Sequence, residues 1–149
     1  MRIDMDMRGI SQVIKDISRF DSMTRLKVKD VINETALNIQ KGAKRRCPVD
    51  TGRLRSSITI QPVGAGGMTM QIGTKVKYAP YIEYGTGKFA NHPTKSGRQT
   101  PWVYPGSKGG RETGEMVFTH GSKPHPFLFP AFEEEKPKFI RAIREALDD

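Results

Sequence analysis

The chain has 149 residues, a formal net charge of +9 and a hydrophobic content of 36%. This length fits one domain built around a single core. A single cysteine excludes an internal disulfide framework and points to a reducing compartment. The N-terminus has no apolar run typical of a signal peptide. No stretch approaches the roughly 18 apolar residues of a membrane span, so we expect no membrane contact.

An amphipathic helix is predicted over residues 9–19, because apolar side chains recur there at i, i+3, i+4 and i+7: Ile10, Val13, Ile14 and Ile17. A second helix is expected to begin after Asp21 or Ser22, either of which can cap it. It should end near Arg46, because Pro48 disfavours helix at Cys47. One face of this second helix carries the apolar residues Leu26, Val28, Ile32, Ala36, Ile39 and Ala43.

The hydrophobic period changes to two after Ser57, which predicts β-strands. Ile58 and Ile60 alternate with polar residues, and the alternation returns after the GAGG stretch at 64–67. Two alternating runs around a glycine-rich link predict an antiparallel hairpin. Residues 78–84, which are rich in tyrosine, predict either a short helix or an aromatic turn.

Residues 86–123 are rich in glycine, proline and charge and have no sustained apolar period. Loops of this length in small domains are usually functional or disordered, so we expect an extended arm that a partner orders. Two short apolar clusters within it, Trp102–Tyr104 and Met116–Phe118, are spaced to pair as a hairpin.

The chain then returns to regular structure. Phe127–Phe129 lie between prolines and are expected to run extended over the core, and a last helix should begin near Pro130 with Glu133–Glu135 at its positive N-terminus. The order of elements predicts one α+β domain over residues 1–149. Its parts are a helical region at 9–46 with two N-terminal helices, an antiparallel sheet at 57–85, a loop or hairpin arm at 86–123, and a return segment with a C-terminal helix at 124–147.

No catalytic, metal or cofactor motif is found. Cys47 has basic neighbours, but it falls where the second helix should bury its last apolar side chain. The spacing of the three histidines does not match a zinc motif. Neither GTGK nor GSKGG matches a phosphate-binding loop. We therefore expect a protein that is not an enzyme and that needs no cofactor.

The stretch CPVDTGRLRSSI at 47–58 is interpreted as a rigid joint between helix and sheet. Asp50 is expected either to form an Asx-turn or to cap a one-turn helix over residues 51–55. Leu54 is expected to point inward and the arginines beside it outward. The predicted joint residues are Pro48, Asp50, Thr51, Gly52 and Leu54.

Basic residues gather at the end of the second helix, in the joint and along the arm. Such a surface can grip phosphates without reading sequence, so a small sequence-independent nucleic-acid-binding protein is one interpretation. A surface that meets an acidic protein partner is another. The candidate contact residues are Lys44, Arg45, Arg46, Arg53, Arg55, Lys95, Arg98, Trp102, Lys108 and Arg111.

Three segments resemble, in the same order, a family of tail-component proteins of long-tailed bacteriophages, the head–tail joining or tail-completion proteins. They are PVDTGRLRSSI at 48–58, YAPYIEYGT at 78–86 and PHPFLFPA at 124–131. The resemblance spans about residues 30–147. It implies an α+β virion subunit that forms a ring, typically sixfold, at the head-proximal end of the tail or in the neck.

The same resemblance implies the partners and the place of the protein. The partners are further copies of the chain and other phage neck or tail proteins, with non-specific contact to DNA passing through the neck left open. The place is the virion tail or neck, reached by assembly in the host cytoplasm. The arm at 86–123 is expected to reach a neighbouring subunit or another ring.

Overall fold

The computed structural model describes residues 2–5, 22–64, 66–108 and 111–148. The helix predicted over residues 9–19 lies outside these ranges. Within them, two long helices, two antiparallel sheets and three short helical segments follow one another along the chain. The α+β class and the C-terminal helix of the prediction are thereby confirmed, and of the two predicted N-terminal helices the described residues contain the second.

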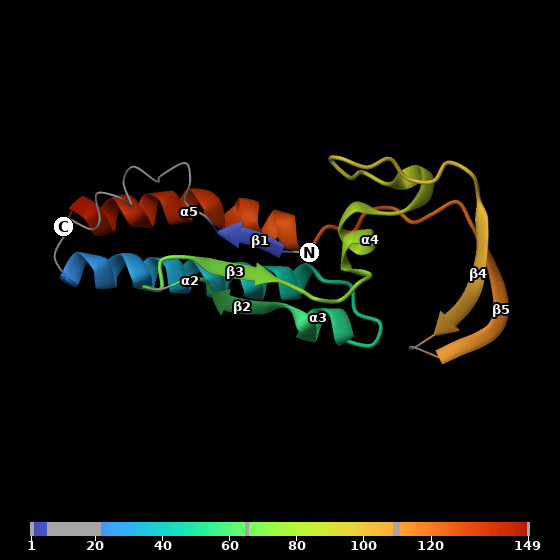
Figure 1. The fold of residues 1–149 in the computed structure, drawn as a ribbon, viewed down its shortest axis with the longest axis horizontal. Helices are drawn as coiled ribbons and strands as arrows, with labels where there is room; N and C mark the ends of the chain where they lie inside the picture. The colour runs from blue at the N-terminus through green and yellow to red at the C-terminus, as the bar shows by residue number, and fades with distance from the viewer. Residues whose placement is uncertain (1, 6–21, 65, 109–110, 149) are drawn as a thin grey trace.

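Two antiparallel helices, α2 (Ser22–Arg46) and α5 (Leu128–Asp148), lie side by side (Figure 1). Together with the three-stranded sheet they form the body of the protein. The two approach closely where Gly42 faces Ala131, since a Cβ at position 42 would lie 3.3 Å from the Ala131 Cβ. The buried residues of α2 recur at helical spacing: Val28, Ile32, Ala36, Ile39 and Ala43. Leu26, expected on this face, is 53% exposed.

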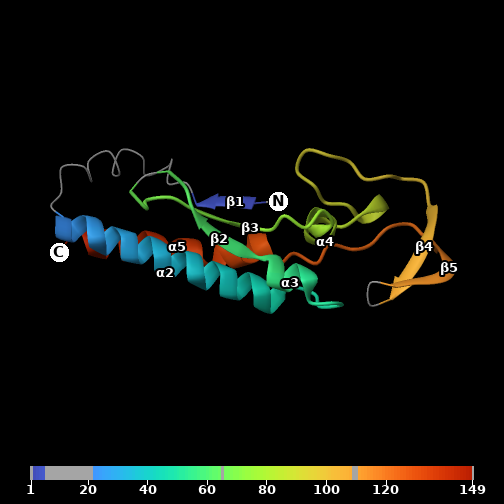
Figure 2. The same cartoon turned by 60° about the horizontal axis from the view of Figure 1, so that its bottom comes forward.

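A three-stranded antiparallel sheet lies against the helix pair (Figure 2). Its strands are β1 (Arg2–Met5), β2 (Thr59–Pro62) and β3 (Met70–Gly73), in the order β1-β3-β2. The predicted hairpin between β2 and β3 is confirmed, with Ile60 opposite Ile72. Ile72 of the central strand is fully buried, as expected for a strand paired on both edges. The strand β1 was not predicted.

Three short helical segments connect the sheet to the arm: α3 (Arg53–Ser57), α4 (Ala79–Tyr84) and the 3-10 turn η2 (Gly87–Phe89). The segment at 78–84 is thus a helix rather than a turn. The last helix begins at Leu128, two residues before Pro130, so Leu128 and Phe129 are helical and not extended as predicted. Glu133–Glu135 consequently lie beyond the first turn of α5, and no acidic residue stands in that turn.

The arm carries a second sheet, the hairpin of β4 (Trp102–Lys108) and β5 (Arg111–Thr119), which projects from one end of the body (Figure 1). Val103 pairs with Phe118 and Tyr104 with Val117, so the pairing predicted from the two apolar clusters is confirmed. The register shifts between Pro105 and Ser107, where proline interrupts the ladder.

The two ends of the arm are held together where they leave the body. The Thr86 N–H donates to the Ser122 carbonyl at 2.9 Å, and the His125 N–H donates to the Ile82 carbonyl at 2.8 Å. Gly85 makes this close approach possible, because its φ of 77° and ψ of 179° belong to a region that side chains rarely adopt. A Cβ at Gly85 would also lie 2.7 Å from the Ser122 carbonyl oxygen.

Replacing Gly85 by alanine is therefore expected to destabilise the protein by about 3 kcal/mol, because backbone strain adds to a steric clash. Urea unfolding measures the loss, and amide hydrogen exchange at Thr86 and His125 should quicken. Gly64→Ala is a matched control, since Gly64 also has a positive φ, of 72°, but has no atom within 4 Å of its Cβ position. It should cost only about 1–2 kcal/mol. Equal losses in the two variants would contradict a role for close packing at Gly85.

Candidate functional site

The three sequence motifs that carry the family resemblance meet at one junction between the body and the arm. Ser57, at the end of the first motif, lies 2.6 Å from the Thr74 hydroxyl, just ahead of the second. Because the Ser57 hydroxyl donates to the Leu54 carbonyl, the Thr74 hydroxyl is the donor of the bond between them. Gln40 of α2 donates to the Ile58 carbonyl at 2.8 Å and fixes the same junction to the long helix.

Glu83 of α4 joins the second motif to the third. Its side chain is buried, and its carboxylate accepts three backbone N–H groups at the start of α5: Phe127 and Leu128 on Oε2 at 2.9 and 3.0 Å, and Phe129 on Oε1 at 2.9 Å. These N–H groups have no partner within the helix, and they stand at its positive end. One carboxylate thereby supplies the acceptors that the local sequence of α5 lacks.

The joint at 47–58 folds differently from the prediction in one respect. The short helix is α3 (Arg53–Ser57), and its N-cap is Gly52 with a φ of 79° and no side-chain cap bond. The hydroxyl of Thr51, not the carboxylate of Asp50, accepts the Arg53 N–H at 3.3 Å. A cap by Asp50 was therefore wrong, because the helix begins at Arg53 and the N-cap position falls to Gly52, which has no side chain to accept an N–H. Leu54 is buried, and Arg53 and Arg55 are exposed.

Cys47 is buried at the end of α2, where its thiol lies near Glu83 and Arg55. Burial raises the pKa of this thiol above its usual range, Arg55 partly offsets the effect, and Glu83 adds to it. The thiol is therefore held in its protonated, weakly nucleophilic form at neutral pH. Among the residues that the structure describes, no group of three or more histidine, cysteine or acidic side chains is placed to hold a metal ion.

The basic residues at the end of α2 do not form one free patch. The Arg46 guanidinium pairs with Glu134 of α5 and also donates to the Gly42 carbonyl. The hydrogen bond and charge of Arg46 hold the pKa of Glu134 below its usual range. Lys44 is half-buried and Arg45 is exposed. Arg46 thus fastens α2 to α5, a role that its sequence position did not reveal.

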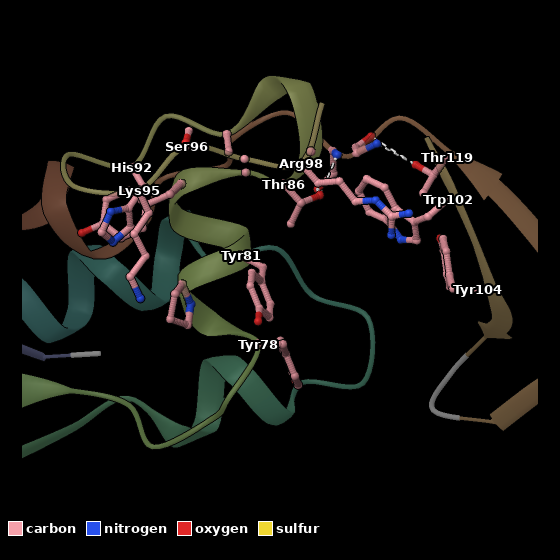
Figure 3. A pocket seen from close by; sticks show the side chains of 18 of the residues that line it. Tyr78, Tyr81, Thr86, His92, Lys95, Ser96, Arg98, Trp102, Tyr104 and Thr119 are labelled. Carbon is pink, nitrogen blue, oxygen red and sulfur yellow. Dashed lines mark hydrogen bonds between the residues drawn. The ribbon is translucent and has the colours of Figure 1, made fainter. Parts of the chain in front are cut away.

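Three of the predicted arm residues, Lys95, Arg98 and Trp102, come together in an open groove of about 900 Å³ between α4 and the base of the hairpin (Figure 3). Tyr78 and Tyr81 stand on one side and Trp102 and Tyr104 on the other. The Arg98 guanidinium carbon lies 5.4 Å from the centre of the Trp102 ring, a cation–π contact. No aspartate or glutamate is among the described residues that line the groove.

Lys108 and Arg111 lie opposite each other at the far end of the hairpin, outside this groove. The joint lines a second groove, of about 680 Å³, in which Ser107 of the hairpin faces residues of the 48–54 loop. The hairpin therefore curves back toward the joint.

Two residues of the site were not predicted: Glu83, which is central to the junction, and Tyr81, which lines the first groove. The only sign of Glu83 in the sequence was its place in the EYGT motif, because no neighbouring residue identifies it as a helix cap.

The chain belongs to the HK97-gp10-like family, described as "Bacteriophage HK97-gp10, putative tail-component", whose model matches residues 11–85, about half of the chain. The class is thus a bacteriophage tail component, as the motif resemblance indicated. No curated protein and no solved structure matches the chain. None of the helices in the described ranges is long and apolar enough to cross a membrane.

Glu83→Ala is expected to lower the free energy of unfolding by about 3–5 kcal/mol, because three N–H groups, two of them in buried hydrogen bonds, lose their charged acceptor. Glu83→Gln should cost about half as much, since the amide oxygen can still accept while the amide NH2 faces a donor. Urea unfolding measures both. The exposed Glu133→Gln is the control and should fall within about 0.5 kcal/mol of the native protein. A native-like Glu83→Ala variant would show that α5 does not depend on this cap.

A second prediction concerns pH. Because the folded protein holds the Cys47 thiol protonated while the unfolded chain ionises above about pH 8.5, stability should fall as pH rises through that range. Cys47→Ala should lose less stability than the native protein between about pH 8 and pH 10. Iodoacetamide at about pH 8 should label Cys47 in urea but not in the folded protein. Rapid labelling of the folded protein would contradict the burial of the thiol.

Proposed function

We propose that this tail component is a ring-forming tail-completion or head–tail joining subunit at the neck or head-proximal end of the tail, without a catalytic role. Membership of the phage tail-component family supports the structural part of the proposal. The sixfold ring follows the expectation set by the motif resemblance. Its place is the virion, reached by assembly in the host cytoplasm with other neck or tail proteins.

The single observation that carries the proposal is the form of the arm. A two-stranded hairpin on its own is marginally stable in water. Here it projects from the body with Val103, Met116 and Phe118 all more than half exposed. Its base is nevertheless fixed by Gly85, Thr86 and the returning segment at 120–125. A rigidly rooted hairpin with an uncovered apolar surface suits a subunit that completes its packing against neighbours.

Contact with DNA in the neck is compatible with the charge distribution. The net charge is +9, and Lys41 and Arg45 are exposed near the C-terminal end of α2. Such residues would meet phosphates in a ring lumen without reading sequence. The alternative of a free nucleic-acid-binding protein rests on the same residues. Arg46 would not contribute to such binding, because its guanidinium already pairs with Glu134.

The proposal is tested by deleting the gene from the phage or prophage that carries it. Filled heads and separate tails should accumulate, and adding the purified native protein to the lysate should restore joined, infectious particles. Negative-stain images of the purified or recovered protein should show rings. Normal particle yield without the gene would contradict the proposal. Binding to short duplex DNA with a steep salt dependence, together with the absence of any ring, would favour the nucleic-acid-binding alternative.

A further inference from the structure

The hairpin has one apolar face that points away from the body. We define the hairpin outer face as Val103, Pro105, Met116 and Phe118. Val103 pairs with Phe118 and Pro105 with Met116, so the four side chains share one side of the two strands. Val103, Met116 and Phe118 are 52%, 64% and 62% exposed. Their neighbours Trp102, Tyr104 and Thr119 occupy the other side and line the groove toward the body.

A second uncovered apolar surface lies on α2. We define the α2 outer stripe as Met23, Leu26, Asp30, Glu34 and Leu37, which are spaced by three or four residues and so share one helix face. Met23, Leu26 and Leu37 are 62%, 53% and 58% exposed. The stripe lies on the side of α2 opposite its buried residues, which face α5 and the sheet.

The hairpin and the α2 outer stripe match in length. The seven residues of β4 extend about 23 Å, at about 3.3 Å per residue. The stripe from Met23 to Leu37 extends about 21 Å, at 1.5 Å per residue along a helix. A hairpin of this length can lie along the stripe, with its apolar outer face at one end of the contact and Lys108 and Arg111 at the other, and a helix packed on a twisted hairpin is an ordinary two-layer arrangement.

The two surfaces also match in charge. Asp30 and Glu34 stand between the apolar residues of the α2 outer stripe, and both are exposed. Lys108 and Arg111 are exposed at the far end of the hairpin and are cross-strand neighbours. Opposite charges beside an apolar contact fix its register and exclude wrong partners. The stripe ends before the basic end of α2, where Lys41 would repel the same cations.

One chain cannot bring its own two surfaces together. The hairpin lies at one end of the molecule, and the N-terminal part of α2, which carries Met23 and Leu26, lies at the other (Figure 1). A contact between them must join two copies through different surfaces. Such head-to-tail contacts repeat from copy to copy and close into a ring when the rotation allows.

We propose that the hairpin outer face of one copy packs on the α2 outer stripe of the next, with Lys108 and Arg111 beside Asp30 and Glu34. This inference rests on the proposed ring and names its subunit contact. Each copy gives its hairpin to one neighbour and receives a hairpin from the other, so every hairpin in the ring is covered on its apolar side.

Two charge-reversal variants test the contact. Asp30→Lys with Glu34→Lys alters the stripe, and Lys108→Glu with Arg111→Glu alters the hairpin. Each alone should need at least about tenfold more protein for half assembly, measured by sedimentation velocity. An equimolar mixture should assemble like the native protein, because each copy then meets a neighbour of opposite charge. The chain that carries all four changes should also assemble. Met116→Asp with Phe118→Asp should abolish assembly in every combination.

The control for net charge is Lys136→Glu with Arg144→Glu, which changes two exposed cations of α5 by the same amount as the hairpin variant. On its own it should assemble like the native protein, and in an equimolar mixture it should not bring the stripe variant into rings. If the native protein forms a ring and both reversal variants assemble equally well, the proposed contact is wrong and the proposed ring still stands. A native protein that stays monomeric at about 1 mM overturns both contact and ring.

Discussion

The fold depends on one buried carboxylate. Glu83, from a helix of six residues, accepts three N–H groups at the start of α5, the helix that covers α2 along its length. A buried charge is costly unless its hydrogen-bonding capacity is used, and here the positive end of a long helix uses it. Because α5 has no acidic residue in its first turn, its position relative to the sheet is set from α4. Local sequence therefore determines that α5 is a helix, and a distant residue determines where it begins.

The same junction decides what the arm can do. The arm leaves and re-enters the body beside Glu83, through the paired segments at Ile82–Thr86 and Ser122–His125. Its base is thus held to the body by hydrogen bonds, whereas its hairpin has solvent on its outer side. A firm root with an uncovered end lets the subunit present a surface in a fixed direction without burying it beforehand. Ordering costs that a floppy loop would incur on binding are reduced accordingly.

Much of the architecture could be predicted from local patterns, because periods of 3.6 and 2 report on burial directly. The helix ending at Arg46 and the β2–β3 hairpin follow from such periods, and the β4–β5 hairpin follows from two short apolar clusters. The strand β1 did not, since four residues are too short a run to show a period and their partners, Met70–Gly73, lie about half the chain away. Glu83 escaped for the same reason, because its partners are 44 to 46 residues downstream. Asp50 was wrongly expected to cap the short helix because that helix begins at Arg53, which gives the N-cap position to Gly52.

The closeness of the arm's two ends has a consequence for how such proteins change over time. Thr86 and Ser122 are joined by backbone and side-chain hydrogen bonds, so the residues between them form one closed loop on the body. A longer or shorter loop can keep the same hydrogen bonds at its ends, and the entropy of closing the loop varies only slowly with its length. Insertions, deletions and exchanges of the hairpin can therefore be tolerated without refolding the helices. The helices and the three-stranded sheet can thus keep their structure while the arm changes to fit a different neighbouring protein.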